Sequence, residues 1–270
     1  MLHATLELAR RIDRAEIDFC AMATVGVAPE AATLERAGGL AVYAAPGSPV
    51  NKVLGLGLGV DVSDEDIDAV EQFYGERSCP VQIELCPLAS PDLPSRLTRR
   101  GYVLQAFENE LARLAPSEPV QLAAGADITV EADANEQQWL NVVAEGFSVP
   151  DRLVPGSPPM PHDAVAAISD IMRLFFHPEI VRYVAHVDGQ AASAAVSFIK
   201  DGVMCIAGTA TRSAFRRRGL QSAIVARAMN DGLRQADLII ATTEPGSVSQ
   251  RTFERLGFRV VYTRAILVKV

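Results

Sequence analysis

The stretch AFRRRGLQSAIVAR, residues 214–227, places three consecutive arginines and a glycine directly before a helical pattern of apolar residues. Leu220, Ile224 and Ala228 recur at the spacing of one helix face, and this pattern predicts a helix that begins near Gly219. The start of a helix presents backbone N–H groups without intrahelical partners and the positive end of the helix dipole. Such a site suits a phosphate or a diphosphate, and Gly219 has no side chain to keep an oxygen away from the backbone.

The arginines of this stretch add positive charge to the predicted anion site. A well-formed hydrogen bond from Arg216, Arg217 or Arg218 to a charged group is worth about 1.5–3 kcal/mol. An arginine run of this kind can also be a solvated surface turn that binds nothing. The apolar strand pattern before the loop and the amphipathic helix pattern after it favour the diphosphate site.

The composition describes a globular chain that can bury one large core or two ordinary ones, with 270 residues of which 49% are hydrophobic. Its net charge of -8 argues against a general nucleic-acid binder, because most of the surface would repel a phosphate backbone. Charged residues interrupt the apolar runs, the N-terminal one included, so we expect no export, no membrane insertion and a cytoplasmic location. The four cysteines form no CxxC pair and the four histidines lack metal-ligand spacing, which predicts free thiols and no metal.

Two stretches of the chain align without a gap. Residues 80–114 and 236–270 lie 156 positions apart, and each contains an apolar run, a turn, a short helix that ends at a glycine, and a last strand. This agreement predicts two copies of one unit. The Pro- and Gly-containing segment after residue 114 predicts a linker, so we expect a first copy at 1–120 and a second copy at 121–270.

The second copy gives an interpretable order of elements. A strand near 128–131 and a helix near 134–146 precede the Pro-rich loop SVPDRLVPGSPPMPHD, and another helix, three strands, the arginine loop and a helix to about 235 follow it. The repeated strand, helix and strand complete the copy. Antiparallel strands followed by two strands that a helix separates predict a mixed, largely antiparallel α/β sheet with flanking helices.

The segments TATRSAFRRRGLQSAIVARAMNDG (209–232) and SVSQRTFERLGFRVVY (247–262) resemble the GCN5-related N-acetyltransferases, the GNAT family. Arg216, Gly219 and Gln221 match that family's pyrophosphate-loop signature, with Gln221 in place of the usual small residue. The resemblance implies two GNAT-like domains in tandem and acetyl-CoA as the co-substrate. It also implies direct transfer of the acetyl group to a primary amine of a small molecule or peptide, through a tetrahedral intermediate and without a metal.

The resemblance also implies which residues form the cofactor site. Backbone N–H groups of 209–211 would stabilise the oxyanion, and Ser247 and Ser249 stand where the family often has an asparagine that touches the pantetheine arm. Either serine could instead cap the helix that follows. The predicted cofactor-binding residues are Thr209, Ala210, Thr211, Arg216, Arg217, Arg218, Gly219, Leu220, Gln221, Ser222, Ser247, Ser249 and Phe253.

The catalytic groups are less clearly marked in the sequence. Phe253 stands where the family often has the tyrosine that protonates the leaving thiolate, but a thiol with a pKa of about 8.5 needs only about 2 kcal/mol of help to leave at pH 7. Glu244 is the candidate general base, and it can equally be a solvated turn residue. Tyr183 and Tyr262 are the alternative acids.

The first copy contains glycines without the pattern of a phosphate loop. Gly55, Gly57 and Gly59 do not make GxGxxG, and the acidic residues at the start of the next helix would repel a phosphate. We therefore predict a degenerate copy without a cofactor loop.

Three function classes remain: an N-acetyltransferase, a catalytically weak or inactive acyl-CoA-binding or regulatory protein, and a module that uses the arginines for an anionic partner. The acidic remainder of the chain disfavours the last. The expected partners are acetyl-CoA and an amine acceptor, with a homodimer as a candidate assembly. Acceptor specificity is expected in the loop at 148–163, where Asp151 and Asp163 could attract a cation.

Overall fold

The computed structural model describes residues 2–22, 24, 30–121, 128–149 and 172–270. The chain forms two compact units, one of Met1–Glu110 with Val260–Val270 and the other of Leu111–Arg259. The first unit therefore includes residues 260–270 from the end of the chain. No helix among the described residues has the length and apolar content needed to cross a membrane.

In its described residues, the first unit combines a sheet with three helices. Its strands lie in the order β1-β2-β3-β4-β11-β5, with β3 and β4 parallel and the pairs β1–β2, β2–β3 and β4–β11 antiparallel. The elements are α1 (Leu6–Met22), β1 (Ala32–Arg36), β2 (Gly39–Tyr43), β3 (Lys52–Leu54), α2 (Asp64–Gly75), β4 (Val81–Leu85), α3 (Leu93–Arg99), β5 (Val103–Leu114) and β11 (Arg259–Lys269).

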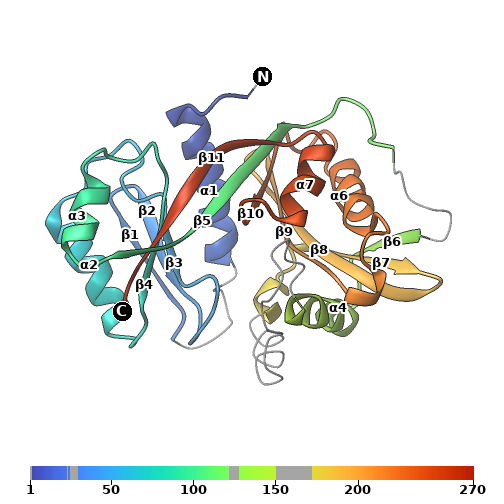
Figure 1. Ribbon diagram of the computed structural model, residues 1–270, viewed down its shortest axis with the longest axis horizontal. Coiled ribbons are helices and arrows are strands. Elements are labelled where there is room, and N and C mark those ends of the chain that lie inside the picture. Colours follow the sequence, from blue (N-terminus) through green and yellow to red (C-terminus); the bar gives the residue numbers. More distant parts are fainter. Residues whose placement is uncertain (1, 23, 25–29, 122–127, 150–171) are drawn as a thin grey trace. The chain divides into compact units, whose positions relative to one another are not determined.

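The second unit begins with the end of β5, and its strands lie in the order β5-β10-β9-β8-β7-β6. Strands β6 to β9 are antiparallel and β10 is parallel to β9, so the predicted mixed sheet is confirmed. Helix α4 lies on one face of this sheet and α6 and α7 lie on the other (Figure 1). The elements are β6 (Ile128–Ala132), α4 (Glu136–Ser148), β7 (Val181–Val187), β8 (Gln190–Lys200), β9 (Val203–Thr211), α6 (Leu220–Asp231), β10 (Leu238–Thr243) and α7 (Val248–Arg255), with short 3-10 helices at Arg173–Phe175 and Ser213–Phe215.

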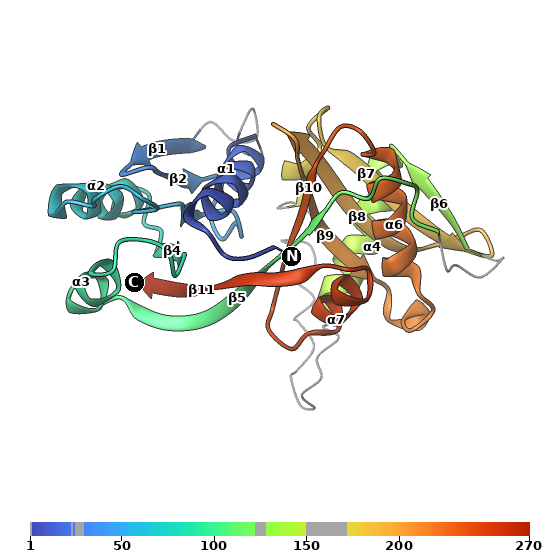
Figure 2. The ribbon, with the colours of Figure 1, turned by 90° about the horizontal axis from the view of Figure 1, so that it is seen from above.

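The elements of the two copies coincide at the offset seen in the sequence. Helix α2 begins 156 residues before α6 (220 - 64 = 156), and β5 begins 156 residues before β11 (259 - 103 = 156). The last strands, however, are exchanged: β4 pairs with β11, and β10 neighbours β5. Figure 2 shows β11, drawn in red, ending within the first unit. The first unit is thus completed by the last strand of the second copy, and β5 runs from the first unit into the second.

A buried cation holds β11 in the first unit. Arg264 has no exposed surface, and its guanidinium lies 2.5 Å from Asp13, 2.8 Å from Glu110 and 3.4 Å from Glu84. Glu16 forms a further ion pair with it. These carboxylates come from α1, β4 and β5, so one side chain of β11 connects three elements. Burial raises the pKa of Glu110 well above its usual value.

Candidate functional site

Strands β9 and β10 are paired at their beginnings and separate beyond them. Residues 203–205 of β9 are in register with residues 238–240 of β10, whereas β9 continues to Thr211 and β10 to Thr243. The described residues show no register pair between the two strands beyond Ile240. Backbone polar groups on the facing edges can therefore bond to a ligand in the opening instead of to a strand.

A β-bulge in β9 lies beside this opening. The register between β8 and β9 shifts between Ala194 and Val196, so Gly208 and Thr209 both lie opposite Ala195. Gly208 has a φ of 60°, in the region that glycine adopts without steric cost. A bulge changes the direction of the backbone in its strand. The bulge therefore reorients N–H groups at the start of the segment Thr209 to Thr211, which is predicted to stabilise an oxyanion.

Trp139 of α4 bonds to the strand opposite the bulge. Its indole Nε1 donates a hydrogen bond of 3.0 Å to the carbonyl oxygen of Ala195, and the side chain has no exposed surface. Ala195 is the residue of β8 that lies opposite both Gly208 and Thr209 of β9. The indole N–H therefore donates to the carbonyl oxygen that lies at the bulge. The sequence contains only this one tryptophan, but nothing local in the sequence assigned it this role.

Helix α6 begins as the arginine stretch predicts. Gly219 is its N-cap with a φ of 80°, and no side chain caps the first turn. The N–H groups of that turn have no acceptor within the helix, so they and the helix dipole favour an anion. A Cβ at Gly219 would meet nothing within 4 Å, which means that the backbone conformation, and not crowding, requires this glycine. Arg217 and Arg218 are exposed beside it.

Arg216 has a different environment from the one expected. Its Nε donates to Thr211 O at 3.2 Å, and its Nη2 donates to Gly146 O at 3.2 Å and to Val149 O. The guanidinium therefore satisfies carbonyls at the C-terminal end of α4, where a positive charge is favourable. In this structure Arg216 supports the loop, whereas Arg217 and Arg218 are exposed at the start of α6.

Arg212 also connects the arginine loop to α4, a role that the sequence pattern does not indicate. Its Nε donates to Glu145 Oε2 at 2.7 Å, and its Nη1 donates to Ala191 O at 3.0 Å. Gly146 allows the close approach of α4, because a Cβ there would lie 2.8 Å from the Cβ of Ala210. The arginine loop is thus tied to the last turn of α4 by side chains that the sequence pattern alone does not pair.

Three of the predicted site residues meet through Gln221. Its Nε2 donates to Thr209 Oγ1 at 3.1 Å and to Ser249 Oγ at 2.8 Å, which links α6 to β9 and α7. Ser247 instead caps α7, since its side chain accepts a hydrogen bond of 3.0 Å from the backbone of Gln250. The two serines therefore take separate roles, and Ser249 is the one that lies with Thr209 and Gln221.

Other predicted cofactor residues form the support of the site. Phe253 is 1% exposed and packs edge-to-face on Phe258 with ring centroids 5.0 Å apart. Leu220 and Ala210 are buried, and Ser222 is half-buried. Ser193 Oγ donates to Ala210 O at 2.7 Å and lies 2.8 Å from Thr211 Oγ1, so the end of β9 is fixed to β8.

The candidate acid–base groups are placed unequally. Glu244 is exposed directly after β10, where its carbonyl accepts a hydrogen bond from Ser247 N in the turn. Tyr183 is buried in the core under α6, and burial raises its pKa to about 12. Tyr262 belongs to the first unit, where its hydroxyl donates to Asp13 at 2.8 Å. Tyr183 belongs to β7, which is not one of the two strands that border the opening. Asp151 and Asp163 are outside the described residues.

The start of α2 in the first unit contrasts with the start of α6. Ser63 stands 156 residues before Gly219, and it forms a capping box with Asp66. Hydrogen bonds from the backbone and hydroxyl of Ser63 lower the pKa of Asp66, and a hydrogen bond from Arg96 lowers the pKa of Asp64. The first turn of α2 is therefore capped by its own side chains and carries acids, which disfavours a phosphate there.

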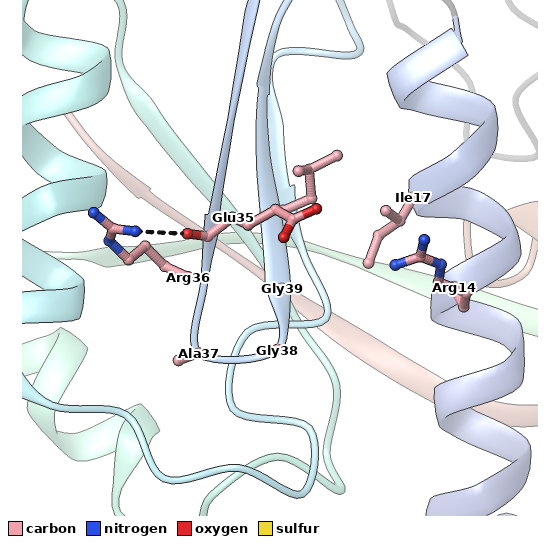
Figure 3. Close-up of a pocket in the computed structure, with 8 residues that line it drawn as sticks. Arg14, Ile17, Glu35, Arg36, Ala37, Gly38 and Gly39 are labelled. Atoms are coloured by element: carbon pink, nitrogen blue, oxygen red, sulfur yellow. Dashed lines mark hydrogen bonds between the residues drawn. The ribbon is translucent and has the colours of Figure 1, made fainter.

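The first unit contains a pocket of about 330 Å³ between α1 and the β1–β2 hairpin (Figure 3). The side chains of Arg14 and Glu35 extend into it from the two elements, whereas Arg36 turns away and donates to the backbone oxygen of Glu35 at 2.9 Å. Arg14 lies 3.4 Å from Asp18 on the same helix. The pocket contains none of the predicted site residues.

Comparisons with known proteins identify the fold. Residues 150–258 match the model of the acetyltransferase (GNAT) family. A GCN5-related N-acetyltransferase from Kribbella flavida is similar in structure, with 19% identity, a TM-score of 0.69 and coverage of 97% of this chain and 95% of that one. A tandem GNAT protein from the clavulanic acid biosynthesis pathway has 12% identity, a TM-score of 0.59 and coverage of 99% and 96%. At these identities the likeness shows the fold. No curated protein matches the chain.

Proposed function

We propose that this chain is an N-acetyltransferase that uses acetyl-CoA and a primary amine, because residues 150–258 match the model of the acetyltransferase (GNAT) family. The amine nitrogen attacks the thioester carbonyl carbon, and a tetrahedral intermediate forms. The carbon–sulfur bond then breaks, so that the products are an N-acetyl amide and the free thiol of CoA. The amine gives up one proton and the thiolate takes one up.

The observation that carries this proposal is the opening between β9 and β10 next to an uncapped helix start. A diphosphate suits the N–H groups at Gly219 with Arg217 and Arg218, and an extended thioester arm suits the space that the strands leave unpaired. Backbone N–H groups at the bulge of β9 would then stabilise the oxyanion, which is typically a large contribution to the rate.

The reaction requires two proton transfers, one from the amine and one to the leaving thiolate. An alkylammonium with a pKa of about 10.4 must lose a proton before it attacks, and we propose Glu244, exposed at the end of β10, as the base or as the entry to a water chain. Phe253 supplies no acid, so the thiolate depends on solvent or backbone donors.

A second candidate function follows from the absence of an acid at Phe253. Without an acid at position 253 the protein could bind acyl-CoA in a regulatory role with weak turnover or none.

We further propose that residues 1–120 form a degenerate copy and that residues 121–270 carry the cofactor. The capping box at Ser63 and the acids of the first turn of α2 support this proposal, because they occupy the position that Gly219 and the arginines hold in the second copy. The four cysteines are free thiols, which is consistent with the proposal that the protein functions in a reducing cytoplasm.

Two measurements separate the proposed functions. Calorimetric titration with acetyl-CoA tests binding, and release of free thiol in the presence of a panel of small amines and peptides tests transfer. Binding with amine-dependent thiol release supports the transferase. Binding without release by any amine supports the acyl-CoA-binding protein, and no saturable binding contradicts both.

A further inference from the structure

Thr243, the last residue of β10, has a buried hydroxyl without a partner. The residue is 5% exposed, and no described residue forms a hydrogen bond with its Oγ1. Other buried hydroxyls in this unit are satisfied: Thr252 Oγ1 donates to Val248 O at 3.0 Å, and Ser193 Oγ donates to Ala210 O at 2.7 Å. A buried polar group is normally hydrogen-bonded, so the Thr243 hydroxyl requires an explanation.

The position of Thr243 in its strand places it at the opening. Successive side chains of a strand alternate between its faces, and Ile239 and Ala241 belong to the core that α6 and Phe253 also form. Thr243 therefore faces the same side as these residues. It also lies beyond Ile240, the last residue of β10 in register with β9. Its hydroxyl is thus on the helix side of the opening, the side on which Gln221 of α6 bonds to Ser249 of α7.

We propose that the Thr243 hydroxyl is a hydrogen-bonding ligand for the amide-bearing arm of an acyl-CoA in the opening between β9 and β10. This inference rests on the proposed function, because that function places the arm there. A threonine hydroxyl can donate one hydrogen bond and accept others, and the arm carries secondary amides that offer both a donor and an acceptor. The bound arm would supply the partner that the protein itself does not.

Thr243→Val tests this inference, since valine keeps the shape and removes only the hydroxyl. We expect the dissociation constant for CoA, measured by calorimetry, to rise about 5- to 10-fold, which is the usual effect of one lost hydrogen bond. Affinity for phospho-ADP, the nucleotide portion of CoA without its arm, should not change. The unfolding temperature without ligand should stay the same or rise, because the variant no longer buries an unpaired hydroxyl. Thr242→Val, on the opposite face of β10, is the matched control and should bind CoA within twofold of the unaltered protein.

Each result decides a different point. If the unaltered protein binds no CoA, the proposed function fails and this inference fails with it. If the unaltered protein and Thr243→Val bind CoA equally well, only the inference is overturned. A clear fall in the unfolding temperature of Thr243→Val without ligand would show that the hydroxyl has a partner within the protein, which also overturns it.

Discussion

The hydrogen bond between Trp139 and Ala195 can be removed while an aromatic ring stays in place. Trp139→Phe eliminates the indole N–H that donates to the Ala195 carbonyl at 3.0 Å. A buried acceptor that loses its partner costs about 1–3 kcal/mol, and the smaller ring adds the cost of a cavity. We therefore expect the free energy of unfolding to fall by about 2–4 kcal/mol, measured by denaturant unfolding with circular dichroism.

The same substitution should affect transfer if the bulge positions the reacting carbonyl. Loss of one oxyanion donor typically costs about 10²–10³ in kcat, and a displaced donor should cost less, so we expect kcat to fall about tenfold with a smaller change in KM. Phe175→Leu is the matched control, because it removes a ring packed edge-to-face on Trp139 and leaves the indole N–H in place. The reasoning is refuted if Trp139→Phe lowers kcat no more than Phe175→Leu does.

Two further predictions concern the first unit. Arg264→Leu should lower the free energy of unfolding of this unit by about 3–5 kcal/mol, because Asp13 and Glu110 would remain buried without their cation. An unchanged denaturant concentration at the midpoint of its unfolding would contradict the prediction. Burial raises the pKa of Glu108 to about 7, above its usual value of 4.5. A raised carboxyl pKa contributes stability that is present below the unfolded pKa and lost as the pH rises through the folded one. The unfolding temperature should therefore fall between pH 4.5 and pH 8, and Glu108→Gln should make this dependence shallower; an equally steep profile would exclude Glu108 as its source.

Local patterns in the sequence predicted much of the fold. The offset of 156, the glycine at the end of α3 and α7, and the start of α6 at Gly219 depend on residues close in the chain, where turn and cap chemistry is readable. The exchange of β5 and β11 depends on pairing between distant strands. Nothing in the alternation of β11 distinguishes β4 from β10 as its partner, although Arg264 in an apolar strand was a visible sign of a special environment.

The candidate site was predicted in part for the same reason. Gly219 and Ser247 have the local roles that their neighbours imply, an uncapped helix start and an N-cap. Arg216 was expected to face a ligand, but its bonds to Gly146 and Val149 depend on where α4 packs against the loop. Trp139 could not be connected to the bulge, because that connection passes through a strand 56 residues away.

Binding of acetyl-CoA to two variants of one residue tests the central claim most directly. Gly219→Asp adds a negative charge at the N-cap of α6, and Gly219→Asn adds a side chain of nearly the same shape that carries no charge and tolerates a positive φ. A unit charge about 4 Å from another costs about 1–4 kcal/mol at the dielectric constants of water and protein surfaces. If the diphosphate lies at this helix start, calorimetry should show binding to the Asp variant at least about tenfold weaker than to the Asn variant. Equal affinity of the two variants would contradict the account, because it would show that no anion binds at Gly219.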